Sequence, residues 1–239
     1  MKTWTEIVST TGGADKVIRT LMYVLRLIIA RNPKLHPRFA LLLPALSESR
    51  VVLRFFGLLH NHRAFLQLLS TLRKERSLSE QNAVAMLQIL AMYAYYPMEH
   101  LYWLDAKKAI NLPIGLGPRL SQWSCRAWLF SVLLDIYIIG WEALRICDKR
   151  KRLQASISQS KSTSSTDLER IAELNERRYQ EMKGLNDDLR KLVIKMVVSL
   201  GDLPLAWTWS WDNTSLSPFF VGLFGSVSSL AGLYLKFDP

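Results

Sequence analysis

The uncharged stretch Asn213–Leu235, NTSLSPFFVGLFGSVSSLAGLYL, stands out in a chain of 239 residues with a formal net charge of +11. A helix rises about 1.5 Å per residue, so a helix of this length would cross the ~30 Å hydrocarbon core of a bilayer. Trp207, Trp209 and Trp211 before it and Lys236 after it are typical anchors at a membrane interface. We therefore predict a transmembrane helix here, with a buried helix of a soluble bundle as the alternative.

Two further apolar segments, Ala83–Leu104 and Trp123–Leu144, are also long enough to span a bilayer. Both carry charge, such as Asp135 in the second, and an ion at the bilayer centre costs about 2.5–3.5 kcal/mol on insertion scales. Packing against other helices, or a shallow position, would lower this cost. The sequence thus leaves the number of spans open between one and four.

Composition and turn signals divide the chain into five regions. Because no strand pattern or internal repeat occurs, the predicted fold class is all-α, a membrane-associated helical bundle with N-terminal amphipathic helices and a C-terminal transmembrane helix. Thr166 has the form of a helix cap, and Gly201-Asp-Leu-Pro204 is expected to end the helix that follows it. The regions are residues 1–80, basic amphipathic helices at the membrane surface; 81–144, an apolar hairpin-like helical membrane region; 145–166, a basic, Ser-rich linker; 167–212, a charged-to-apolar helix; and 213–239, the C-terminal transmembrane segment.

The basic surface belongs mainly to residues 1–80, which carry 13 basic and 5 acidic side chains. Two helices with a polar stripe along one side are predicted there, Ala14–Arg31 and roughly Glu48–Arg73. Near an anionic membrane we expect the basic side chains of these stripes to face lipid headgroups. They are Lys16, Arg19, Arg26, Arg50 and Arg54. Nucleic acid is not expected as a partner, because the aromatic residues cluster away from the basic stretches.

The opposite face of the second helix carries large apolar side chains, which we expect to enter the lipid. They are Val51, Val52, Phe55, Phe56, Leu59, Leu66 and Leu69, and His62 interrupts them. Fully burying one such side chain is worth ~1.5–3 kcal/mol, which outweighs the roughly 1 kcal/mol that a basic residue adds near an anionic surface. A helix inserted in this way would expand one leaflet and favour curvature. From periodicity alone, the two helices could equally bury these faces against each other.

Small residues recur at helical spacing in the final apolar segment: Gly222, Gly225, Ser226, Ser229 and Gly232. Such a stripe lets helices approach closely in lipid. It predicts either self-association into a homo-oligomer or close packing within one chain, and the pattern fits both equally.

Nothing in the sequence has the form of an enzyme site. The four histidines and two cysteines show neither metal-ligand spacing nor the arrangement of an activated nucleophile. We therefore predict no catalytic residue, no metal site and no cofactor. Asp135 and Asp202 lie in apolar surroundings, and hydrogen bonding between packed helices is the preferred interpretation of both.

Several short motifs resemble, in the same order, the peroxisomal biogenesis factor 11 (peroxin-11) family, nearest its fungal and gamma-type branch. They cover most of the chain except the Ser-rich linker. The motifs are Thr11–Arg19 (TGGADKVIR), Ser49–Arg54 (SRVVLR), Tyr95–Trp103 (YYPMEHLYW), Ser124–Trp128 (SCRAW) and Lys191–Leu205 with its Gly-Asp-Leu-Pro.

The resemblance implies a non-enzymatic integral protein of the peroxisomal membrane, with its N-terminal region facing the cytosol, that remodels and elongates this membrane in peroxisome proliferation and fission. It implies three kinds of partner, namely an anionic phospholipid membrane, further copies of the chain, and proteins of the fission machinery. A peroxisomal membrane channel for small metabolites, with Asp135 lining a water path, is the alternative. Ala14 departs from the family pattern, because members often carry arginine at this position.

Overall fold

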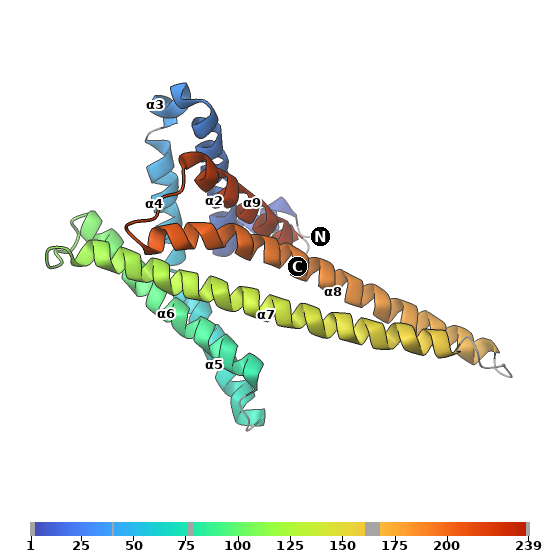
Figure 1. Cartoon of the computed structure of the whole chain (residues 1–239). Coiled ribbons are helices and arrows are strands. Elements are labelled where there is room, and N and C mark those ends of the chain that lie inside the picture. The colour runs from blue at the N-terminus through green and yellow to red at the C-terminus, as the bar shows by residue number, and fades with distance from the viewer. Residues whose placement is uncertain (1–2, 40, 76–78, 161–167, 238–239) are drawn as a thin grey trace.

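A computed structural model describes residues 3–39, 41–75, 79–160 and 168–237. These residues form helices joined by short turns, with no strand among them, which confirms the all-α prediction (Figure 1). The elements are α1 Trp4–Val8, α2 Thr11–Arg31, the 3₁₀ turn η1 Pro33–Leu35, α3 His36–Phe39, α4 Leu42–Arg54, α5 Gly57–Glu75, α6 Glu80–Ala106, α7 Leu116–Ser160, α8 Leu168–Ser210 and α9 Pro218–Phe237.

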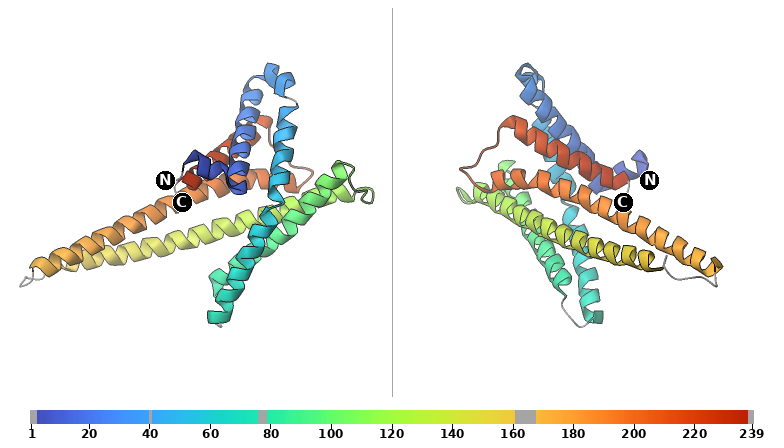
Figure 2. Two further views of the ribbon diagram at one scale, coloured as in Figure 1. Left: turned by 180° about the vertical axis from the view of Figure 1, so that it is seen from behind. Right: turned by 45° about the vertical axis from the view of Figure 1, so that its right-hand side comes forward.

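Two long antiparallel helices, α7 and α8, lie side by side and form the axis of the molecule (Figures 1 and 2). On one side α6 packs along α7, and α5 folds back on α6. On the other side α2 packs along α9, and α4 returns beside α2. Helix α9 therefore has neighbours on two sides, α2 and α8.

Three of the described helices are long and apolar enough to cross a bilayer: Leu116–Ser156 in α7, Glu173–Ser210 in α8, and α9 itself. By length and composition, α9 agrees with the predicted C-terminal span. The predicted segment Ala83–Leu104 lies in α6, which is not one of the three. Helix α8 is a candidate span in its place. The sequence analysis did not predict this span, because the first half of α8 is charged and only its second half is apolar.

The helix end predicted at Gly201-Asp-Leu-Pro204 is wrong, because the helix continues through the proline. Helix α8 passes Gly201 and Pro204 and ends at Ser210, and α6 passes Pro97. A proline removes one backbone hydrogen bond from a helix. Helices within a membrane tolerate this loss when neighbouring helices support them, and α8 and α6 both pack along α7.

The predicted single helix Glu48–Arg73 is two helices, since α4 and α5 are separated at Phe55 and Phe56. The break lies where the chain turns onto α6, and a Cβ atom added at Gly57 would come within 2.7 Å of the Tyr96 ring. Farther along, α7 continues to Ser160, so the first part of the predicted linker 145–166 is helical. The predicted cap at Thr166 lies outside the described residues.

The small-residue stripe of α9 packs within this chain. A Cβ atom at Gly222 would lie 2.7 Å from the backbone of Leu27, and one at Gly225 would overlap the ring of Tyr23. Across the same helix, a Cβ atom at Gly201 of α8 would lie 2.9 Å from the side chain of Ser228. Of the two readings of the stripe, the structure thus shows close packing of α9 against α2 and α8.

We predict opposite effects of the same substitution at two helical glycines. Gly225→Ala should lower the melting temperature of the purified protein, because the buried Tyr23 ring has no room to move and overpacking costs roughly 1–3 kcal/mol. Gly140→Ala should raise it slightly, because no atom lies within 4 Å of the new methyl group and alanine favours a helix by about 0.5–1 kcal/mol. Equal shifts in the same direction would contradict this packing of α2 on α9.

Candidate functional site

The polar stripe of α2 points into the protein. Arg19 is only 6% exposed, and its guanidinium forms an ion pair with the carboxylate of Asp202 on α8. One guanidinium nitrogen donates to Asp202 Oδ2 at 3.3 Å, and another donates to the hydroxyl of Ser228 on α9 at 3.2 Å. The hydroxyl of Ser228 donates in turn to Asp202, so three helices meet at this buried cluster.

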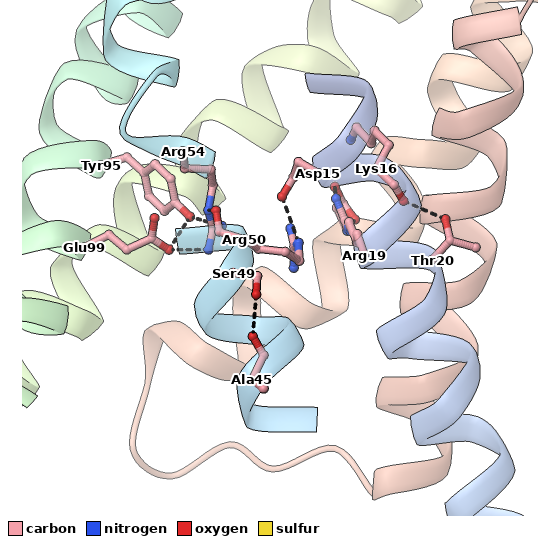
Figure 3. A network of polar contacts seen from close by, with 11 residues as sticks. Asp15, Lys16, Arg19, Thr20, Ala45, Ser49, Arg50, Arg54, Tyr95 and Glu99 are labelled. Carbon is pink, nitrogen blue, oxygen red and sulfur yellow. Dashed lines mark hydrogen bonds and ion pairs between the residues drawn. The ribbon is translucent and has the colours of Figure 1, made fainter. Parts of the chain in front are cut away.

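Two further ion pairs continue the polar interior from α2 through α4 to α6 (Figure 3). Arg50 Nε donates to Asp15 Oδ1 at 2.9 Å, which joins α4 to α2. Arg54 Nη2 lies 2.9 Å from Glu99 Oε1, and Arg54 Nη1 donates to the Tyr95 hydroxyl at 2.7 Å. These contacts join α4 to α6.

Three of the five basic side chains expected to face lipid headgroups are directed into the protein instead. The side chains of Arg19, Arg50 and Arg54 are held in ion pairs inside the protein. Periodicity finds a polar stripe, but it does not tell whether water, headgroups or other helices cover it. Lys16 and Arg26 differ, because neither forms an ion pair within the described part of the chain and both are half-buried.

The apolar face of α4 and α5 points outward. Five of its seven predicted members are exposed, and the exposed fraction of Leu59 is 63%. They are Val52, Phe55, Phe56, Leu59 and Leu66, whereas Val51 and Leu69 are half-buried. Of the two predicted arrangements, the structure therefore excludes the one in which the N-terminal helices hide these faces against each other. His62, which interrupts the face, bonds the Tyr93 hydroxyl at 2.7 Å.

This polar-in, apolar-out pattern is opposite to that of a water-soluble bundle. In lipid, apolar side chains lose nothing by facing outward, whereas each polar group needs a partner inside the protein. Large apolar side chains also lie exposed on the candidate spans, for example Phe130 and Leu133 of α7 and Leu230 of α9. The arrangement of side chains is thus the one expected of a helical bundle in a membrane.

A cavity of about 740 Å³ lies behind the inward polar stripe. Its walls combine charged groups from α2, α4, α6 and α8 with aromatic side chains such as Tyr96, Trp103 and Trp128. A second cavity, of about 450 Å³, shares Lys16 with the first and contains Asp135, whose carboxylate accepts a hydrogen bond from Gln88. Burial, together with the nearby Arg19 guanidinium, lowers the pKa of Lys16 to about 8.

The two apolar-segment aspartates make the contacts predicted for them. Asp202 pairs with Arg19 of α2, and Asp135 of α7 accepts from Gln88 of α6, so each joins two packed helices. Sequence reasoning missed the partner of Asp202, which is 183 residues away in the chain. It also missed that Glu99 would receive Arg54, because no local pattern joins positions so far apart.

Aromatic residues gather where α7 begins and α8 ends. Arg126 lies over the Trp211 ring, 4.4 Å from its centroid, and Trp128 stacks on Trp209 at 5.8 Å. Amphipathic aromatic rings with a cation beside them are typical of the membrane–water interface. These contacts fit the predicted role of the tryptophans as interfacial anchors.

Within the described ranges, no group of three histidine, cysteine or carboxylate side chains is placed to hold a metal ion. His100 stacks on Phe55 at 3.8 Å between ring centroids, where it serves the packing of α4 on α6. The functional features of the described residues are therefore the outward apolar faces and the inward polar cavity.

Comparison with known proteins points to one family. The model of the peroxisomal biogenesis factor 11 family matches residues 1–236. An uncharacterised protein of Schizosaccharomyces pombe is 32% identical over 128 residues, which are 53% of this chain and 58% of the yeast protein. The chain thus aligns with a little over half the length of that relative. No solved structure matches the chain.

We predict that the Arg19–Asp202 pair is coupled. Arg19→Met alone should lower the free energy of unfolding by ~3–5 kcal/mol, because it leaves a buried carboxylate without its cation. The double variant Arg19→Met/Asp202→Leu should lose less than the two single variants summed. Thermal or denaturant unfolding of the purified protein in neutral detergent measures both. Strictly additive losses would show that the two groups do not interact.

Proposed function

This chain belongs to the peroxisomal biogenesis factor 11 family, a family of peroxisome biogenesis factors, and we propose that it remodels and elongates the peroxisomal membrane in proliferation and fission. In this proposal it is an integral, non-enzymatic protein whose substrate is the bilayer itself. The observation that carries the proposal is the outward apolar face of α4 and α5, with Leu59 and Phe56 more than half exposed.

The proposed mechanism is insertion of α4 and α5 into one leaflet of the bilayer. Each fully inserted apolar side chain contributes about 1.5–3 kcal/mol, so the five exposed members of the face hold these helices in the lipid. The bulk of the inserted helices enlarges that leaflet and bends the membrane toward it. The ion pairs of Arg50 and Arg54 support this action, because they fix α4 to α2 and α6 and so tie the inserted helices to the rest of the bundle.

The proposal includes the three kinds of partner that the resemblance implied. Anionic phospholipid would meet the exposed cations at the end of α5, Arg73 and Lys74. Self-association would use the outer face of α9, where Phe220 and Leu230 are exposed, because its small-residue stripe is filled by α2 and α8. Fission proteins would be recruited to membrane shaped in this way.

A channel for small metabolites is a second candidate, favoured by the series of polar cavities. The cavity behind the α2 stripe shares Lys16 with the one that contains Asp135. That second cavity shares Glu142 and Lys195 with a third of about 670 Å³ between the distal parts of α7 and α8. A polar file through an apolar-faced bundle is what a solute path requires.

The two ends of the described chain meet, from which we predict a shared orientation. The ring centroids of Trp4 and Phe237 are 4.6 Å apart, and the labels of the two chain ends lie close together in Figure 1. Tags on both termini should therefore be digested together when protease is added to intact peroxisomes, since we propose that an even number of helices crosses the bilayer and that this end faces the cytosol. Protection of either tag alone would contradict the antiparallel pairing of α2 with α9 in the membrane.

Membrane deformation should depend on the apolar face of α5 and the turn before it. We predict that Phe56→Asp/Leu59→Asp abolishes tubulation of anionic liposomes by the full chain, because two carboxylates cannot enter the lipid. The matched control is His60→Asp/Gln67→Asp, which adds two carboxylates at polar positions and should retain tubulation. The positions changed in the two double variants are all exposed. Electron microscopy of the liposomes provides the readout.

Equal tubulation by the two double variants would contradict the insertion mechanism.

A second experiment distinguishes membrane remodelling from the channel function. If the wild-type chain leaves liposomes spherical but conducts ions in a planar bilayer, and Asp135→Asn changes that conductance, the channel function is favoured. A silent recording together with tubulation favours remodelling.

A further inference from the structure

The cavity behind the α2 stripe has more cations than its carboxylates neutralise. Its walls carry five cationic and four acidic side chains, and three of the cations are already held in ion pairs. The cations are Lys16, Arg19, Arg26, Arg50 and Arg54, and the acids are Asp15, Glu99, Asp202 and Asp212. Asp212, the acid outside those pairs, accepts from Gln122. Lys16 and Arg26 are thus the cations without an ion-pair partner in the described ranges.

Several buried donor atoms on this wall have no hydrogen-bond partner among the residues that the structure describes. They include Arg26 Nε, Arg19 Nε and Trp103 Nε1. A buried donor without an acceptor is costly, and a charged one costs more. An oxyanion would neutralise the excess positive charge and would also accept hydrogen bonds from the unpaired donors. Glu99 Oε2 also lacks a partner there and could accept from a ligand hydroxyl.

Arg26 also lines a second, mostly apolar space. This groove, of about 710 Å³, runs between α2, the start of α4 and the start of α9, with Ile29, Leu43 and Val221 on its walls. The guanidinium of Arg26 therefore stands where a polar cavity meets an apolar groove. A ligand that suits both has an anionic head and a hydrocarbon tail.

We propose that this junction binds one anionic phospholipid, with its phosphate on Arg26 and an acyl chain along the apolar groove. The lipid is preferred to a free phosphate because the groove offers apolar walls that a soluble anion would leave unused. Arg26 lies over the Tyr23 ring at 5.9 Å, which holds the guanidinium in position. Lys16, near Gly232 at the other end of α2, adds positive potential to the cavity without touching the phosphate.

This site is separate from the outward face of α4 and α5 that the proposed function uses. It takes a single lipid molecule into the protein, whereas membrane bending inserts protein into the bilayer. The two proposals therefore fail independently: loss of lipid binding leaves the insertion mechanism untouched, and spherical liposomes leave the lipid site untouched.

Calorimetric titration of the purified full chain in neutral detergent tests the proposal. The probes are dioctanoyl phosphatidate, dioctanoyl phosphatidylcholine and glycerol 3-phosphate. Phosphatidate should bind saturably, and Arg26→Gln should weaken it about tenfold or more, as expected for loss of a charge-assisted hydrogen bond. Arg26→Lys should retain part of the affinity. The matched control is Lys34→Gln, an exposed cation of the next turn outside both cavities, which should change binding less than about twofold.

Three outcomes would overturn the proposal. Equal affinity for phosphatidate and phosphatidylcholine would show that the headgroup charge is not read. Binding of glycerol 3-phosphate as tight as that of phosphatidate would assign the site to a soluble phosphate. Unchanged phosphatidate binding by Arg26→Gln would place the lipid elsewhere, and the melting temperature without ligand shows whether each variant remains folded.

Discussion

The ion pair between Arg19 and Asp202 sets the orientation of the N-terminal half of the protein. A cation on α2 and a carboxylate on an apolar helix each need a partner once water is excluded. When Arg19 turns inward to meet Asp202, the rest of the α2 stripe turns with it, and α4 follows because Arg50 pairs with Asp15. The apolar sides of these helices are then left on the outside, where only lipid or another apolar surface suits them.

Part of this architecture could be predicted from the sequence. The absence of charge in Asn213–Leu235 predicted α9, and the spacing of polar residues predicted α2 and its stripe. The direction of the stripe could not be predicted, because the partner of Arg19 lies 183 residues away. The helix end predicted at Pro204 was wrong, because packing along α7 outweighs the local preference of this proline, as it does for Pro97 in α6. For the same reason, the small residues of α9 revealed close packing but not the helices involved.

The same inward arrangement separates two surfaces with different roles. Outward, the apolar side chains of α4 and α5 form the surface that we propose enters a leaflet, which is what a member of this family would need to shape a membrane. Inward, the surplus cations Lys16 and Arg26 line a polar cavity that suits an anionic headgroup, and Lys16 also lines the neighbouring cavity of the alternative solute path. Both surfaces follow from one choice of helix rotation.

The most direct measurement of that rotation is spin-label accessibility in anionic liposomes. In a background of Cys125→Ser and Cys147→Ser, labels placed one at a time at Leu59 and Leu66 should be reached by oxygen dissolved in lipid rather than by a water-soluble nickel chelate. A label at Lys151, on an exposed basic segment of α7, should show the reverse. If the labels at Leu59 and Leu66 meet the nickel chelate as readily as the label at Lys151, these faces do not lie in lipid and the account is contradicted.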